Sequence, residues 1–356
     1  MERAARSARR TGPLLFVLTV LLSACDSTEP ALSTGRPADS VPAVPQDTLP
    51  VDSTPGPPND SLVPPPDTTG PVDPPGAVVH LGIPFGPFAL PASRYGPEFT
   101  GAYRPPGPDS GAGVAQLLLA DLEKARRTNT RVLLNLTGPE HYFADDAGFS
   151  LAQWKRLVDR FRGLDLTSYI ADGTIVGHFL MDEPNDASNW NGKPVSPAEV
   201  EEMAKYSKEI WPAMPAIVRA WSDYLIGFHY QYLDAAWAQY CLYCGNSRYR
   251  LPIDAFTAQA VRDAHAAGLG LVVGLNVLSG GSGASGIPGR KPGQYAMSAG
   301  EIRSWGDALL REPYICAFFM WKYDSVYFSR PEIKAALLDL SHQAQNHPKQ
   351  ACRRQS

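Results

Sequence analysis

The 356-residue chain lacks several features that would narrow its function at once. It has no basic excess, since 32 Lys and Arg stand against 36 Asp and Glu, so we expect no binding of nucleic acid. Its five cysteines include no second cysteine pair or histidine pair at zinc spacing, so we expect no metal site. The apolar run at residues 14–22 is too short to remain in a bilayer as a spanning helix.

A glycine-rich phosphate loop is also missing. Gly280, Gly281 and Gly283 follow an apolar run, but they lack the G-x-G-x-x-G spacing and no helix begins directly after them. We therefore expect no nucleotide and no other cofactor.

The first 25 residues are predicted to direct export. Four arginines precede the apolar run 14–22, as in a secretory signal. The run ends in Leu22-Ser23-Ala24-Cys25, which resembles the lipobox of bacterial lipoproteins. This resemblance implies that Cys25 carries the lipid that anchors the protein on the extracytoplasmic side of a bacterial membrane, in the cell envelope. An ordinary secretory peptide with a chance cysteine is the alternative.

Residues 26–76 have no aromatic residue and are predicted to be a disordered linker. They contain fourteen prolines and eight acidic residues against the single base Arg36. Such a composition buries too little apolar surface to offset the entropy lost on ordering. Proline-rich chain favours extended geometry, so we expect a tether between the anchor and a folded domain. A proline-rich recognition segment is the alternative.

Residues 77–347 are predicted to form one α/β domain, a (β/α)8 TIM barrel, followed by a tail at 348–356. Short β-branched runs alternate with amphipathic stretches, which is typical of parallel βα units. The predicted strands are residues 78–83, 131–136, 174–181, 216–220, 234–240, 269–277 and 314–321. The predicted helices are residues 114–127, 150–162, 196–211, 254–267, 298–311 and 329–346.

A barrel requires an eighth strand. We place it within residues 85–107 or around residues 164–172. An open doubly wound sheet of seven strands is the alternative architecture.

The most informative strand end is at residues 174–184. An apolar run leads directly into Asp182-Glu183-Pro184. Carboxylates leaving a buried strand are costly unless they are paired or lie in a cleft. In one interpretation the two carboxylates have a structural role, in an ion pair or as a helix cap. In the other, Glu183 is a general acid/base whose pKa is raised by apolar surroundings at the open end of the barrel.

A strand that ends in Asp-Glu-Pro resembles the acid/base strand of TIM-barrel glycoside hydrolases, which carry Asn-Glu-Pro at the fourth strand. The resemblance implies that Glu183 is the proton donor and that Trp321, after the last strand, lies at the sugar site. The nucleophilic glutamate expected at the seventh strand is replaced by Asn276.

A second carboxylate must then come from elsewhere, because glycosidases ordinarily use two. Asp324, just past the last strand, is the candidate that requires the least distortion of the backbone to act as the second carboxylate. Asp182 resembles the aspartate that orients an acetamido group in substrate-assisted hexosaminidases, provided that the backbone turns at Pro184. Asp223 is a further candidate.

Other polar and aromatic residues near strand ends are suited to binding a sugar. Two have plausible structural roles instead, since His178 lies inside an apolar strand and Arg219 could pair with Asp182 or Glu183. The predicted substrate-binding residues are Asn135, His178, Arg219, Gln239, Tyr240, Asn276, Trp321 and Lys322.

The cysteines beyond Cys25 belong to a chain predicted to be exported to an oxidising compartment. Cys241 and Cys244 form one C-x-x-C, which we expect to close a short loop as a disulfide. Cys316 lies in an apolar strand and is expected to be a buried free thiol.

The sequence thus predicts a lipid-anchored, exported, glycoside hydrolase-like barrel with a carbohydrate substrate and Glu183 as acid/base. The main alternative is a non-catalytic barrel that binds polysaccharide or a cell-envelope partner. An envelope structural lipoprotein is a third possibility. The sequence provides no basis for an oligomeric state.

Overall fold

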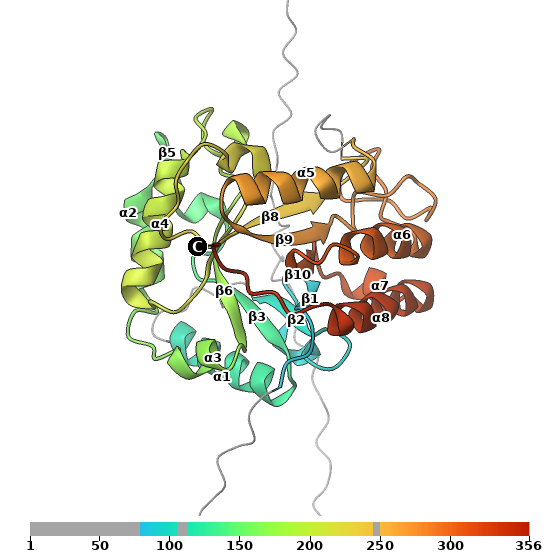
Figure 1. The fold of residues 1–356 in the computed structure, drawn as a ribbon, viewed down its shortest axis with the longest axis horizontal. Helices are drawn as coiled ribbons and strands as arrows, with labels where there is room; N and C mark the ends of the chain where they lie inside the picture. The colour runs from blue at the N-terminus through green and yellow to red at the C-terminus, as the bar shows by residue number, and fades with distance from the viewer. Residues whose placement is uncertain (1–78, 105–112, 245–249, 356) are drawn as a thin grey trace, which may run out of the picture. The chain divides into compact units, whose positions relative to one another are not determined.

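The computed structural model describes residues 79–104, 113–244 and 250–355. The predicted signal, the lipid anchor Cys25 and the linker at 26–76 lie outside these described residues. The described residues form an eight-stranded parallel sheet that curls into a nearly closed barrel surrounded by helices (Figure 1). The predicted barrel fold is confirmed.

The sheet order follows the chain. Each strand pairs in parallel with the next, from β2 round to β10, and β1 then pairs with β10. The strands are β1 (Phe85–Pro87), β2 (Gly101–Arg104), β3 (Arg131–Asn135), β6 (Ile175–Asp182), β7 (Ala216–Arg219), β8 (Ala235–Tyr240), β9 (Gly270–Leu275) and β10 (Ile315–Met320). A two-stranded hairpin, β4 (Ala144–Asp145) and β5 (Gly148–Phe149), lies outside the barrel sheet. Sequential parallel pairing brings all eight carboxyl ends to one mouth.

The helices begin where the sequence provides caps. Ser150 caps α2, and Ser196 and Ser298 form capping boxes with Glu199 and Glu301 at the starts of α4 and α6. The helices are α1 (Gly113–Arg127), α2 (Leu151–Asp159), α3 (Thr167–Ala171), α4 (Pro197–Ile210), α5 (Ile253–Ala266), α6 (Ala299–Leu310), α7 (Ser325–Phe328) and α8 (Pro331–Asn346).

The first and second strands meet at the seam of the barrel. A bridge between Phe88 and Tyr103 joins them, and their rings stack with centroids 3.6 Å apart. A Cβ on Gly86 would lie 1.8 Å from the carbonyl oxygen of Gly101, so glycine is needed for this backbone approach. Both of these strands lie inside the window 85–107, in which the eighth strand was expected.

The predicted first strand at residues 78–83 is wrong. The strand begins at Phe85, while Gly82 adopts a left-handed conformation with φ of 52°. A Cβ on Gly82 would lie 1.9 Å from the carbonyl oxygen of Ala344, and the Ile83 amide donates to that same oxygen at 2.9 Å. This segment therefore crosses the end of α8 and does not pair in the sheet.

Aromatic rings fill the interior of the barrel. Tyr103, Phe179, Trp237 and Phe319 are buried together, with Trp237 in ring contact with the other three. The Trp237 side chain is therefore part of the core beneath the mouth.

The end opposite the mouth is closed by the C-terminal tail. Cys352 is buried and forms a disulfide with Cys316 of β10, with Cα atoms 5.1 Å apart. The Gln355 amide donates to the Gly268 carbonyl at 2.9 Å, and Arg353 lies 4.0 Å from Asp234. The predicted free thiol at Cys316 is wrong, because the tail returns to the barrel and brings Cys352 to it.

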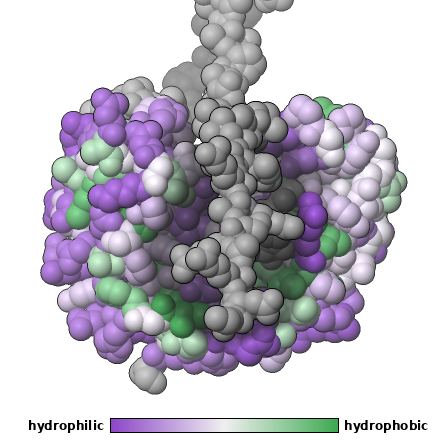
Figure 2. Space-filling model, turned by 90° about the horizontal axis from the view of Figure 1, so that it is seen from above, coloured by the Kyte–Doolittle hydropathy of each residue, from purple (hydrophilic) through white to green (hydrophobic). Residues whose placement is uncertain are grey.

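Where the face drawn in Figure 2 is not covered by grey atoms, hydrophobic residues occur in small groups among hydrophilic ones. No helix in the described ranges is long and apolar enough to cross a bilayer.

Candidate active site

Two acidic side chains meet at the mouth end of β6. Strict alternation would send Asp182 and Glu183 to opposite faces, but the register of β6 against β7 shifts between Phe179 and Asp182. Glu183 then adopts a left-handed conformation with φ of 41°, which is rare for a residue other than glycine. The turn therefore occurs at Glu183 itself, and both carboxylates reach the same neighbour.

That neighbour is Arg219, at the end of β7. Its Nε contacts Oδ1 of Asp182, and its Nη2 lies 3.3 Å from Oε1 of Glu183. The side chain of Arg219 is only 11% exposed, whereas those of Asp182 and Glu183 are 21% and 28% exposed. The nearly buried guanidinium of Arg219 thus contacts both carboxylates, and both remain partly exposed to solvent.

The backbone of Glu183 is fixed on both sides. Its amide donates to the Arg219 carbonyl at 2.8 Å, and its carbonyl accepts from the Trp190 indole at 3.1 Å and from the Asp186 amide at 3.0 Å. Trp190 is fully buried. A strained residue held by several contacts is typical of functional sites.

The pKa of the Glu183 carboxyl results from opposing effects. The Arg219 guanidinium lowers it, but burial and the charges of Asp182 and Asp186 raise it, and the net shift is upward. A raised pKa allows a carboxyl to keep a proton at higher pH, which suits a general acid.

A third acidic residue, Glu140, was missed by sequence analysis. It begins the 3₁₀ turn η2 (Glu140–Tyr142), five residues beyond β3, and β3 pairs with β6. Burial is the main cause that raises its pKa, and the charges of Asp182 and Glu183 act in the same direction, so that the pKa is about 7. Because Glu140 lies in a loop and not directly at a strand end, no local pattern in the sequence indicates a site there, and only the pairing of β3 with β6 brings it close.

Asn135 organises the loop that carries Glu140. Its Oδ1 accepts from the amides of Thr137 at 3.0 Å and Gly138 at 2.9 Å, and its Nδ2 donates to the hydroxyl of Tyr103. These polar atoms are already used within the protein, and the residue is 7% exposed. The structure therefore gives Asn135 a positioning role, in place of the predicted contact with substrate.

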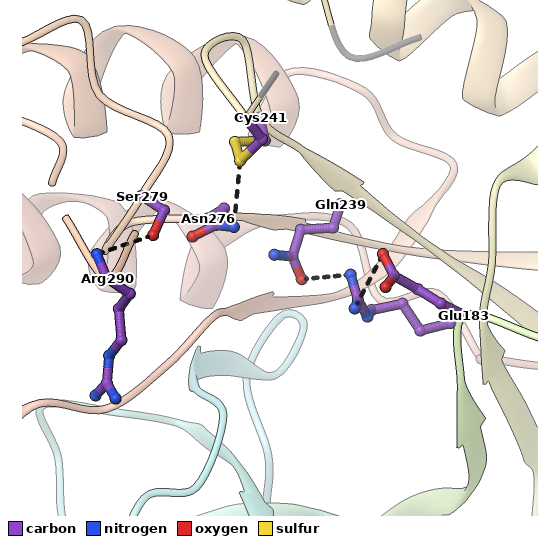
Figure 3. The surroundings of a disulfide bond; sticks show 8 residues. Glu183, Gln239, Cys241, Asn276, Ser279 and Arg290 are labelled. Carbon is purple, nitrogen blue, oxygen red and sulfur yellow. Dashed lines mark hydrogen bonds and ion pairs between the residues drawn. A yellow bond between two sulfur atoms is a disulfide. The ribbon is translucent and has the colours of Figure 1, made fainter. Parts of the chain in front are cut away.

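Polar residues continue along the mouth from β7 to β9. Arg219 donates through Nη1 to Oε1 of Gln239 at 3.4 Å, and Asn276 follows β9. Nδ2 of Asn276 donates to Sγ of Cys244 at 3.4 Å, and Cys244 forms a disulfide with Cys241 at the end of β8. Figure 3 shows this series, with Asn276 beside the disulfide and Gln239 toward Glu183.

The β10 side of the mouth carries Trp321, half-buried and bridged to Asn276. The ammonium of Lys322 lies 6.0 Å from its ring centroid. Asp324, the predicted second carboxylate, caps α7 by accepting from the amides of Val326 at 3.1 Å and Tyr327 at 2.9 Å. Asp324 therefore has a structural role as a helix cap. The carboxylate that Arg219 holds next to Glu183 is that of Asp182.

Two predicted substrate-binding residues point away from the mouth. His178 is fully buried, stacks on Trp154 and lies 2.8 Å from the hydroxyl of Ser207, between the sheet and the helices. Tyr240 is also buried, and its hydroxyl donates to the Leu251 carbonyl at 3.1 Å. These assignments are corrected: alternation along β6 and β8 sends both side chains to the helical layer.

No family model and no curated protein matches the chain. Solved structures resemble it in fold. A GH2 β-galacturonidase from Eisenbergiella tayi is 12% identical, with a TM-score of 0.47 over 74% of this chain and 51% of that one, so this chain spans about half of its length. The clostridial cellulose synthase subunit Z from Clostridioides difficile is 12% identical, with a TM-score of 0.48 over 72% and 99% of the two chains.

An endocellulase from Pyrococcus horikoshii is 14% identical, with a TM-score of 0.46 over 74% of this chain and 93% of that one. Identities of this size reflect fold alone, and TM-scores below 0.5 carry no argument about activity. The solved structures that resemble this chain in fold thus include glycoside hydrolases, and none of these comparisons assigns it to a particular family.

Proposed function

We propose that this protein is a glycosidase that uses Glu183 as its general acid/base. The observation that carries the proposal is the sharing of one guanidinium by two carboxylates, Asp182 and Glu183, at the mouth of a parallel barrel. In this arrangement the pKa of Glu183 is raised although Arg219 lies beside it. Perturbed carboxyls at a barrel mouth are typical of acid/base catalysts.

In the proposed reaction Glu183 donates its proton to the glycosidic oxygen as the bond from that oxygen to the anomeric carbon breaks. The leaving sugar departs as an alcohol, and water supplies the new hydroxyl on the other product. Asp182 and Glu140 are the favoured second carboxylates, because both interact electrostatically with Glu183. Asp324 is less favoured because it caps α7.

The experiment is a screen of the purified protein against chromogenic glycosides and bacterial and plant polysaccharides, with release of reducing ends as the readout. Glu183→Gln keeps the shape of the side chain and removes the transferable proton. Glu202→Gln, on the exposed face of α4, is the matched control. A substrate cleaved by the wild type and the control, but not by Glu183→Gln, supports the proposal. Equal activity of all three proteins would refute it.

We further propose that the substrate lies outside the cytoplasm and that Cys25 anchors the protein in the cell envelope. The support is the sequence Leu22-Ser23-Ala24-Cys25 after a charged and apolar segment. Cys25→Ser should abolish metabolic labelling by a fatty acid. A variant that is still labelled would contradict lipidation at Cys25.

A barrel that binds polysaccharide without cleaving it is the second candidate. Asn276 favours it, because this residue follows β9 where the resemblance to glycoside hydrolases implies a nucleophilic glutamate. Binding of a glycan in calorimetry, together with no cleavage of any glycan in the screen, would establish this function in place of the first.

A further inference from the structure

We infer that the β10 side of the mouth holds a subsite for a uronic-acid unit, whose carboxylate is bound by Arg290 and Arg330. The inference rests on the proposed function in that the ligand is part of a glycan. It goes beyond that function because it specifies the charge of the substrate.

A pocket lies between two loops at this side of the mouth. The loop after β9 and the segment after β10 each contribute apolar and charged side chains. Its lining includes Leu278, Ile287, Arg290, Asp324, Val326 and Arg330. The apolar residues form walls that suit the faces of a sugar ring, and the arginines supply hydrogen-bond donors.

The guanidinium of Arg290 is available to a ligand. Its backbone amide donates to the Ser279 hydroxyl at 3.3 Å, which fixes the start of the side chain, and the guanidinium points away from Ser279 in Figure 3. The side chain is 43% exposed, and no hydrogen bond within the described residues uses its guanidinium. A planar guanidinium with free donors matches a carboxylate in a bidentate manner.

Asp324 does not neutralise the pocket. Its Oδ2 forms an ion pair with Nη2 of Arg290 at 3.7 Å, a distance longer than a hydrogen bond, while its Oδ1 accepts hydrogen bonds from the amides of Val326 and Tyr327. Among the residues that line the pocket, two arginines and one aspartate give a net charge of one positive unit. This charge favours an anionic ligand over a neutral one.

Trp321 connects the pocket to the rest of the mouth. The guanidinium of Arg290 lies 5.7 Å from the centroid of its ring, and the exposed part of that ring offers a flat surface to a neighbouring sugar. In the sheet order β10 is four strand intervals from β6. At about 4.8 Å per interval, the ends of β10 and β6, which carry Trp321 and Glu183, are separated by roughly 19 Å along the rim. The ligand is therefore an acidic oligosaccharide or polysaccharide, with its charged unit remote from the cleaved bond.

The test measures binding in the Glu183→Gln protein, so that the ligand is not cleaved. Polygalacturonate, alginate and glucuronoxylan are titrated by calorimetry at low salt, each beside its methyl ester, which keeps the rings and removes the charge. Dextran sulfate and neutral dextran distinguish a carboxylate from a sulfate and from an uncharged chain. Arg290→Gln, Arg290→Lys and Arg330→Gln are compared with Arg156→Gln, an exposed arginine on α2.

We expect at least one uronate polymer to bind roughly tenfold or more tightly than its ester, the size of a charged hydrogen-bonded contact. Arg290→Gln should lose that preference, Arg290→Lys should keep part of it, and Arg156→Gln should keep all of it. The inference is overturned if no uronate polymer binds, if acid and ester bind equally, if Arg290→Gln behaves like Arg156→Gln, or if dextran sulfate binds as tightly as the uronate.

The two proposals fail in different ways. Uronate binding that depends on Arg290, with no hydrolysis by the wild type, would refute the glycosidase and keep the subsite. Hydrolysis of neutral glycans alone, unchanged by Arg290→Gln, would refute the subsite and keep the glycosidase.

Discussion

Nη2 of Arg219 lies 3.3 Å from Oε1 of Glu183, and the same guanidinium contacts the preceding residue, Asp182. The contact is possible because Glu183 has a positive φ, which keeps two successive side chains on one side of the strand end. Arg219 lowers the pKa of Glu183 yet does not bring it down to the ordinary value, because the neighbouring carboxylates and burial oppose it. The pKa of Glu183 therefore depends strongly on Arg219.

Removing that cation should shift the pH profile. In Arg219→Met the pKa of Glu183 should rise, so the basic limb of kcat/KM, where the acid loses its proton, should move to higher pH. The folded state should lose roughly 1–3 kcal/mol, because two partly buried carboxylates lose their partner. Activity across pH and thermal unfolding measure the two effects. Arg219→Lys should restore part of both, and an unchanged basic limb in Arg219→Met would contradict the role of Arg219.

Glu183→Gln should lower kcat on substrates with poor leaving groups by a factor of about 10² to 10⁴, the usual contribution of a general acid. Substrate binding should survive, because the amide keeps the shape of the carboxyl. Steady-state kinetics and calorimetry on the same substrate test this. The control Glu202→Gln should match the wild type in both.

Asp182 and Asp324 should differ in their effect on catalysis. Asp182→Asn should cost activity by a factor comparable to Glu183→Gln, because Asp182 shares Arg219 with the acid. Asp324→Asn should have a smaller effect on kcat, since Asp324 accepts two amide hydrogens at the start of α7. Kinetics with neutral substrates decide between them. A large loss of kcat in Asp324→Asn alone would restore Asp324 as the second carboxylate.

Glu140 should make stability depend on pH. Its pKa is raised to about 7 in the folded protein from 4.5, so the folded state binds more protons than the unfolded state between these values. The free energy of unfolding should therefore fall as the pH rises through that interval. Glu140→Gln should not show this fall in the free energy of unfolding. Above pH 7 the variant should therefore be more stable than the wild type, by on the order of 1 to 3 kcal/mol. Urea denaturation across pH measures the difference, and parallel curves for the two proteins would contradict the raised pKa.

The two disulfides should differ in their contribution to stability. Cys316 and Cys352 are 36 residues apart, whereas Cys241 and Cys244 are 3 apart. Closing the longer loop removes more entropy from the unfolded chain, about 3–4 kcal/mol against about 2 kcal/mol. Thermal unfolding of the two double alanine variants should rank them in this order. A smaller loss in the Cys316→Ala, Cys352→Ala protein would show that the tail is held by its other contacts.

Much of the barrel was predictable because its determinants are local. Six of the seven predicted strands pair in the sheet, and the helices after Ser196 and Ser298 begin at capping boxes visible as Ser-x-x-Glu. The failure at residues 78–83 has a tertiary cause. That segment is apolar like a strand, but the end of α8 occupies the space beside Gly82.

The sequence by itself determined the alternation of parallel strands and helices and the position of Asp182 and Glu183 at a strand end. These depend on periodicity and on the order of residues along the chain. Only the tertiary structure decided which side chains meet. Strand register sends His178 and Tyr240 to the helices, the pairing of β3 with β6 brings the loop of Glu140 to the candidate acid, and the returning tail joins Cys352 to Cys316. Contacts between distant residues depend on how strands align and where loops return, which no short stretch of sequence encodes.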